Sequence, residues 1–162
     1  MAKTTKAKTL KKTEEGWKFF QKKKFDQALS VFNQMIDDDA DQNALYGRAC
    51  VSLRTNNLEE AYKDLATLLK SDENNTKYLH TRAMAYGADG QYDKTKKDLN
   101  LVLQIMPDNV EAWCDLGGLY LATEDYPNAR DCFERAADID KACSLAWLGK
   151  GIAALSFKEY RK

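Results

Sequence analysis

The sequence predicts an all-α protein made of stacked helix pairs, and an internal repeat is the main reason. Large apolar residues recur every thirty-four positions, at Leu45, Leu79, Trp113 and Trp147. A small residue follows each of them by four positions, at Ala49, Ala83, Gly117 and Gly151. Apolar residues lie three or four positions apart and show no period of two, which indicates amphipathic helices rather than strands. A repeat of this length is typical of units that stack on one another to bury their apolar faces.

The repeat divides the chain into about four units plus one terminal helix. The expected units are residues 9–41, 42–75, 76–109 and 110–143, with a single helix in 144–162. The first unit is one residue shorter, because Gly16 stands thirty-three residues before Ala49. Each complete unit is predicted to hold two helices, and Asn57, Asn109 and Asp125 are predicted to cap helix starts.

The small residues are expected to let helices approach closely within each unit. For the terminal helix we expect Trp147, Gly151 and Ala154 to pack onto the preceding unit. This leaves a second apolar stripe at helical spacing, formed by Leu145, Leu148, Ile152 and Leu155. We expect this stripe to mediate self-association or docking of a partner, because exposed apolar patches usually mark interaction surfaces.

Composition places the chain among ordinary folded proteins. It has 162 residues, of which 44% are hydrophobic and 31% charged, and no apolar run is long enough to span a membrane. The N-terminus has no secretory signal, so a cytoplasmic location is expected. Residues 1–24 hold nine lysines and two glutamates, and residues 1–8 are predicted to form a basic, flexible arm. No aromatic residue lies among the lysines of this arm to stack on bases, so nucleic-acid binding is not predicted.

The chain lacks the residue patterns of the common enzymes. His80 is the sole histidine, and the four cysteines form no CxxC pair, so neither a metal site nor a cofactor is expected. There is no glycine-rich phosphate loop and no nucleophile with a catalytic base, which predicts a protein that is not an enzyme. The acidic run from Asp37 to Asp41 lacks the spacing of a calcium loop and is predicted to be a solvated helix end.

One stretch carries a recognisable motif. Trp113, Leu116, Gly117 and Tyr120 form W-x2-L-G-x2-Y, and the same unit continues with Ala129 and Phe133 in A-x3-F, after Pro107 of the preceding unit. This pattern resembles the tetratricopeptide repeat, and the resemblance covers roughly residues 9–160. It implies a right-handed superhelical solenoid of antiparallel helix pairs, whose concave groove binds an extended or helical peptide.

The resemblance also implies which residues line the groove, on the first helix of each unit. The candidates are Trp17, Phe20, Tyr46, Cys50, Leu53, Lys77, His80, Met84, Cys114 and Leu121. This set is largely apolar, which favours the apolar face of an amphipathic partner segment. Two alternatives stay open, since Trp17 and Phe20 could pack inside the first unit, and Cys50 and Cys114 could be small core residues.

Some members of the family grip the C-terminal carboxylate of chaperones with lysine, asparagine and arginine. The matching positions here are Tyr46, Cys50, Thr81, Glu111 and Asp115, so such a clamp is not predicted. The sequence instead predicts a non-catalytic adaptor that binds a protein or peptide partner and helps assemble a complex. The alternatives are a small dedicated chaperone of the secretion type and a self-assembling scaffold.

Overall fold

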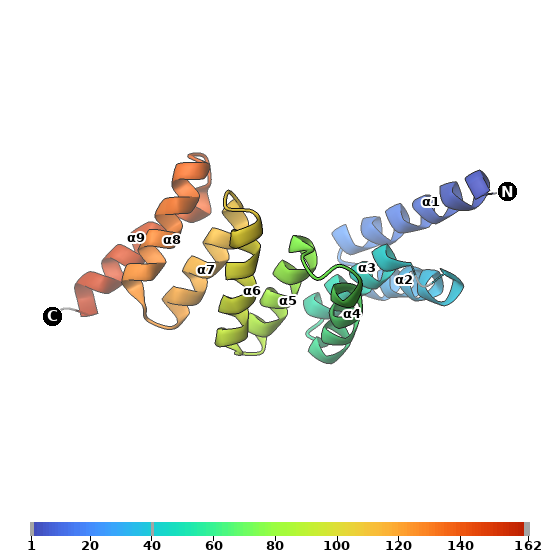
Figure 1. Cartoon of the computed structure of the whole chain (residues 1–162), viewed down its shortest axis with the longest axis horizontal. Coiled ribbons are helices and arrows are strands. Elements are labelled where there is room, and N and C mark those ends of the chain that lie inside the picture. The colour runs from blue at the N-terminus through green and yellow to red at the C-terminus, as the bar shows by residue number, and fades with distance from the viewer. Residues whose placement is uncertain (1, 40, 161–162) are drawn as a thin grey trace. The chain divides into compact units, whose positions relative to one another are not determined.

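A computed structural model describes the backbone of residues 2–39 and 41–160 and the side chains of residues 9–38 and 41–158. These residues form nine α-helices and no strand, as the apolar spacing predicted (Figure 1). The helices are α1 (Ala2–Gln21), α2 (Phe25–Asp39), α3 (Gln42–Arg54), α4 (Leu58–Ser71), α5 (Thr76–Ala88), α6 (Tyr92–Ile105), α7 (Val110–Ala122), α8 (Tyr126–Ile139) and α9 (Ser144–Tyr160). The first helices of the later units therefore begin thirty-four residues apart, at Gln42, Thr76, Val110 and Ser144.

Two boundaries differ from the expected organisation. Helix α1 begins at Ala2, so its backbone includes most of the segment predicted as a separate arm; the side chains of Lys3, Lys6 and Lys8 lie outside the described residues. The chain also divides into two compact units, residues 1–85 and 86–162, and the division falls within α5.

Both compact units contain a phenylalanine enclosed by two glycines. In residues 1–85, a Cβ atom on either Gly16 of α1 or Gly47 of α3 would collide with the ring of Phe32. In residues 86–162, a Cβ atom on Gly117 of α7 or Gly149 of α9 would likewise collide with the ring of Phe133, more closely at Gly149 than at Gly117. Such contacts hold three helices at short separation, because the ring fills the space that the missing side chains leave.

The turn between the two helices of a unit adopts the left-handed conformation at a repeating position. The residues with positive φ are Lys23 (57°), Asn56 (59°), Gly90 (69°) and Glu124 (60°), each thirty-three or thirty-four residues after the one before. Glycine and asparagine tolerate this conformation, whereas a lysine or glutamate is strained there.

The predicted helix caps are confirmed at two of three positions. The side chain of Asn109 accepts a hydrogen bond from the backbone N–H of Ala112 at 2.9 Å, and that of Asp125 accepts one from Asn128 at 3.3 Å. Asn57 precedes α4 as expected, but its side chain makes no capping hydrogen bond. The prediction of a side-chain cap at Asn57 was therefore wrong.

Candidate functional site

A row of aromatic rings connects three helices of the compact unit 1–85. The ring centroid of Tyr46 on α3 lies 5.9 Å from that of Trp17 on α1 and 5.4 Å from that of Tyr78 on α5. Trp17 also contacts Phe20 and Phe32, at centroid distances of 5.4 and 5.6 Å. We call Trp17, Tyr46 and Tyr78 the aromatic row. All three side chains are half-buried, so the row belongs both to the interior and to the surface.

Two polar neighbours of Tyr46, Thr81 and Cys50, are uncharged. The hydroxyl oxygens of Tyr46 and Thr81 lie 3.2 Å apart and share a hydrogen bond. Burial raises the pKa of Tyr46 to about 12 and that of the Cys50 thiol to about 11. Both groups are therefore neutral at physiological pH, and they offer neutral hydrogen bonding beside the apolar rings.

The remaining candidates of residues 1–85 differ in how much they expose. Met84 is 45% exposed and Lys77 is also exposed. The half-buried candidates are Trp17, Phe20, Tyr46, Cys50, Leu53 and His80. Trp17 and Phe20 pack against the buried cluster that contains Phe32, so they serve the core of the unit as well as its surface.

Of the two candidates in the other compact unit, one is buried and one is half-buried. Cys114 is 5% exposed, and its Sγ atom lies 4.0 Å from that of Cys143. Burial raises the pKa of Cys114 to about 12, and the low exposure of this residue leaves little of its surface for contact with a partner. Leu121 is half-buried and packs against the same apolar cluster.

The acidic run at the end of α2 is divided between two structural roles. Asp38 forms an ion pair with Lys12 at 3.3 Å, and Asp41 caps α3 by accepting hydrogen bonds from Asn43 and Ala44 at 2.7 and 3.0 Å. Among the described residues, no group of three acidic, histidine or cysteine side chains is arranged to hold a metal ion.

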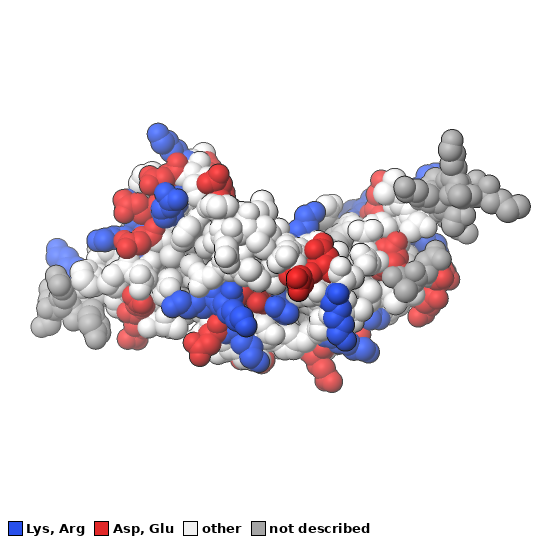
Figure 2. Space-filling view, in the orientation of Figure 1, with Lys and Arg blue, Asp and Glu red and all other residues white. Residues whose placement is uncertain are grey.

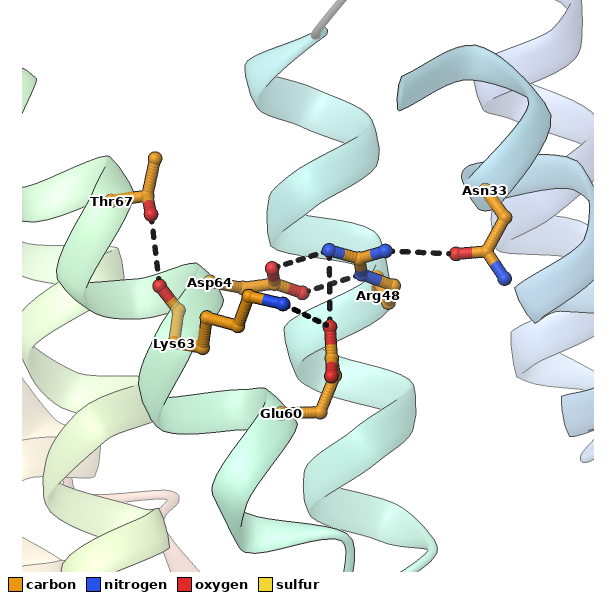
Figure 3. A network of polar contacts seen from close by, with 6 residues as sticks. All are labelled: Asn33, Arg48, Glu60, Lys63, Asp64 and Thr67. Carbon is orange, nitrogen blue, oxygen red and sulfur yellow. Dashed lines mark hydrogen bonds and ion pairs between the residues drawn. The ribbon is translucent and has the colours of Figure 1, made fainter. Parts of the chain in front are cut away.

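A buried ion pair that we did not predict joins α3 to α4 (Figure 3). The guanidinium of Arg48 donates to both carboxylate oxygens of Asp64 at 2.7 Å and to Asn33 of α2 at 3.0 Å. Glu60 lies 3.2 Å from the same guanidinium, and the Asp64 side chain is 2% exposed. The hydrogen bond to Asp64 raises the pKa of Arg48 further above its usual value. The sequence holds a signal for this pair, because an arginine and an aspartate recur thirty-four residues later, at Arg82 and Asp98.

The terminal helix α9 does not pack as we predicted. Its buried residues are Ala146, Gly149 and Ala153, whereas Trp147, Gly151 and Ala154 are exposed. The prediction was wrong because the face that carries Trp147 is the one that a second helix covers in a complete unit. The predicted apolar stripe, Leu145, Leu148, Ile152 and Leu155, is exposed at every position.

Charged side chains of both signs are interspersed on the face drawn in Figure 2, without a broad patch of one sign. No helix among the described residues is long and apolar enough to cross a lipid bilayer. A shallow hollow of about 480 Å³ lies at the turn between α5 and α6, lined by Gly90, Gln91, Tyr92, Asp93, Lys94 and Thr123.

The helix pairs and their thirty-four-residue repeat define an all-α repeat protein. Residues 88–152 match a family model described as "Tetratricopeptide repeat". Residues 88–152 therefore match the tetratricopeptide repeat, and the described residues have the fold of tetratricopeptide-repeat proteins, which are in general protein-interaction modules.

Two curated relatives illustrate how far the similarity reaches. The chain is 25% identical over 134 residues to Tetratricopeptide repeat protein 13 of Homo sapiens, covering 79% of this chain and 16% of that protein. It is 33% identical over 63 residues to the heat-shock protein cognate (HSC) co-chaperone sgt12 of Aspergillus fumigatus, covering 39% of this chain and 18% of that protein. The chain thus spans less than a fifth of the length of either relative.

Solved structures share the fold at low sequence identity. A tetratricopeptide repeat protein from Parabacteroides merdae has a TM-score of 0.78 and 22% identity, covering 94% of this chain and 61% of that one. YrrB, described as a TPR protein with an unusual peptide-binding site, has a TM-score of 0.73 and 20% identity, covering 84% of this chain and 71% of that one.

Proposed function

We propose that the chain is a non-catalytic adaptor whose residues 1–85 bind an amphipathic peptide segment beside the aromatic row. The observation that carries this proposal is the row itself, in which Trp17, Tyr46 and Tyr78 present connected half-buried rings from three helices. Partly exposed aromatic rings provide large apolar contact with little loss of side-chain entropy, which suits them to peptide binding.

Met84 extends this surface along α5. His80 and Met84 are four residues apart and therefore share one face of the helix, and the flexible thioether of Met84 adapts to differently shaped partners. The neutral state of Tyr46 and Cys50 supports binding by apolar burial rather than by ion pairs. Leu121 is proposed as a separate contact on the other compact unit.

The test begins with a display library of amphipathic peptides of about 15 residues, long enough for four helical turns, selected on the intact chain. We expect the double substitution Tyr46→Ala with Met84→Ala to weaken the selected peptides at least ~10-fold. Met106→Ala is the matched control, because Met106 is 46% exposed and Met84 is 45% exposed. Equal loss in the control would show that the chosen surface is not the binding site.

The salt dependence of binding distinguishes a peptide bound at the aromatic row from one bound at the basic N-terminal segment. Binding by apolar burial should change little between about 50 and 500 mM salt. Binding that disappears over this range, withstands the double substitution and is lost on deletion of residues 1–8 would assign the function to the N-terminal segment instead.

A second candidate function is that of a small dedicated chaperone, which the similarity to the co-chaperone sgt12 favours. An adaptor and a chaperone differ in what happens to the partner alone. If a selected partner stays soluble and folded without this chain, the adaptor role is supported; if it aggregates unless the chain is present, the chaperone role is.

A further inference from the structure

Cys143 stands where the other repeats carry a helix-capping side chain. It directly precedes α9, and its backbone carbonyl accepts a hydrogen bond from the N–H of Trp147 at 3.4 Å, as the carbonyl of a capping residue does. The residues at the same place in the earlier repeats, at a spacing of thirty-four, are Asp41, Asn75 and Asn109. The side chain of each accepts a hydrogen bond from a backbone N–H in the first turn of its helix. A thiol is a weak acceptor, so capping does not account for a cysteine at this place.

The side chain of Cys143 lies beside a second thiol. Its Sγ atom is 4.0 Å from that of Cys114 on α7, and both residues belong to the compact unit 86–162. Both cysteines are free thiols in the structure. The sulfur atoms of a disulfide are about 2.0 Å apart, so an approach of about 2 Å would join this pair. The fold thus holds two reduced thiols within short reach of a covalent bond.

The two thiols differ in exposure. Cys114 is 5% exposed, whereas Cys143 is half-buried. Partial exposure is a property of this place in the repeat, because Asp41, Asn75 and Asn109 are half-buried as well. Burial also raises the pKa of Cys114, which keeps its thiol protonated and less reactive. A small oxidant from solution therefore reaches Cys143 first, and Cys114 is placed to react with the product.

We propose that Cys114 and Cys143 form a reversible disulfide by exchange with a small disulfide in solution, of the kind that oxidised glutathione represents. The Cys143 thiolate attacks one sulfur of that molecule, forms a mixed disulfide and releases a thiolate, which takes up the proton that Cys143 lost. The Cys114 sulfur then attacks the Cys143 sulfur and expels the second small thiolate, to which the Cys114 proton passes. Two protein thiols are oxidised, and one small disulfide is reduced to two thiols.

The disulfide closes a loop that contains the whole of α8. Residues 115–142 lie between the two cysteines, and α8 lies within this range. Such a cross-link lowers the entropy of the unfolded chain, so oxidation makes the repeat 110–143 more resistant to unfolding. Because both cysteines lie outside residues 1–85, the inference does not rest on the proposed peptide site.

The test uses the intact chain and a variant in which Cys50→Ala with Cys132→Ala leaves only the proposed pair. Both proteins are equilibrated with a series of ratios of reduced to oxidised glutathione, and the remaining thiols are blocked with N-ethylmaleimide. Trypsin places Cys114, Cys132 and Cys143 on different peptides. We expect mass spectrometry to show Cys114 linked to Cys143 in both proteins. In the folded chain this disulfide should withstand a glutathione buffer at least ~10-fold more reducing than in the urea-unfolded chain.

Thermal stability provides a second readout. Oxidation should raise the melting temperature of the intact chain by at least ~5 °C, and dithiothreitol should reverse the increase. Cys143→Asn is the matched control, because asparagine is the residue at the same place in two other repeats, at Asn75 and Asn109. Circular dichroism should show this variant folded, and its melting temperature should not respond to oxidised glutathione.

Three results would overturn the proposal. The first is that Cys114 and Cys143 stay fully blocked by N-ethylmaleimide across the glutathione series, or form their disulfide no more readily in the folded chain than in urea. The second is that Cys143 stops at the mixed disulfide with glutathione, or that the link joins two chains or other cysteines. The third is that oxidation stabilises the Cys143→Asn variant as much as the unaltered chain.

Discussion

Repeats 42–75 and 110–143 use the same helix positions for different interactions. In 42–75, Arg48 and Asp64 form a buried ion pair. In 110–143 the equivalent positions hold Leu116 and Cys132, both of which are buried. The comparison shows that one backbone arrangement accepts either a charged or an apolar pair. The charged pair depends on Arg48, because without its guanidinium the Asp64 carboxylate, which is 2% exposed, would be a buried charge.

The largest effect should come from breaking the charged pair. Arg48→Leu leaves the Asp64 carboxylate buried without its guanidinium, and we expect a loss of about 3–5 kcal/mol in the free energy of unfolding. Adding Asp64→Cys gives repeat 42–75 the residues of repeat 110–143 and should restore most of that loss. Urea unfolding of the single and double variants measures both values. A double variant no more stable than the single one would show that the two repeats are not interchangeable here.

The next effect concerns helix crossing. Repeat 42–75 uses Ala49 with Leu65, whereas repeat 110–143 uses Gly117 with Phe133. Gly117→Leu should destabilise the chain by ~1–3 kcal/mol, because the new side chain overlaps the Phe133 ring. Thermal unfolding followed by circular dichroism tests this, with Gly118→Leu as the control in open space.

A double substitution that exchanges the residue pair of one repeat for that of the other tests the same helix crossing. Gly117→Ala with Phe133→Leu recreates the pairing of Ala49 with Leu65 and should be more stable than the sum of the two single changes predicts, by at least about 0.5 kcal/mol. Simple additivity would mean that residue 117 and residue 133 do not share one packing site.

A smaller effect is expected at the turns. Asn56 and Glu124 hold equivalent left-handed positions, with φ of 59° and 60°. Glu124→Asn should raise the free energy of unfolding by about 0.5–1 kcal/mol, and Asn56→Glu should lower it by a similar amount, because asparagine tolerates this conformation better than glutamate. Melting temperatures that shift in the same direction for both variants would contradict this explanation.

The smallest expected effect is a difference in reactivity between the thiols of Cys50 and Cys132. The pKa is raised to about 11 at the half-buried Cys50 and to about 12 at the buried Cys132. In native protein, iodoacetamide should therefore modify Cys50 before Cys132, as mass spectrometry of the digested chain can show. Because both pKa values lie above that of an unfolded thiol, the stability gained from these thiols is full below about pH 8.5 and falls as pH rises toward 11 and 12.

Sequence periodicity predicted the helices well, because every unit must bury the same face to stack. The beginnings of α3, α5, α7 and α9 follow directly from the spacing of Leu45, Leu79, Trp113 and Trp147. Periodicity did not predict which face of α9 is buried. The pattern shows which residues are apolar but not which neighbouring helix covers them. Trp147 has the same spacing as Trp113, and only the structure shows that its face is uncovered.

The candidate groove illustrates a second limit. Family positions indicated Cys114 and Tyr46 equally, yet Cys114 is buried against Cys143 and Tyr46 lies in the aromatic row. How far a side chain is covered depends on the size of its neighbours on other helices, which a position within one repeat does not reveal. The pair Arg48 and Asp64 was visible as a repeated spacing, but its significance required knowing that the two side chains meet inside the protein.

The buried pair also bears on the fidelity of folding. A chain of similar helix pairs must choose among similar partners while it folds, and misassembly is a characteristic failure of repeat proteins. If α3 packed against α8 instead of α4, Arg48 would be buried beside Cys132, and if α7 packed against α4, Asp64 would be buried beside Leu116. Each error would leave a charge unpaired at a cost of several kcal/mol. The Arg48–Asp64 pair therefore favours the native packing of α3 against α4 over these two wrong pairings.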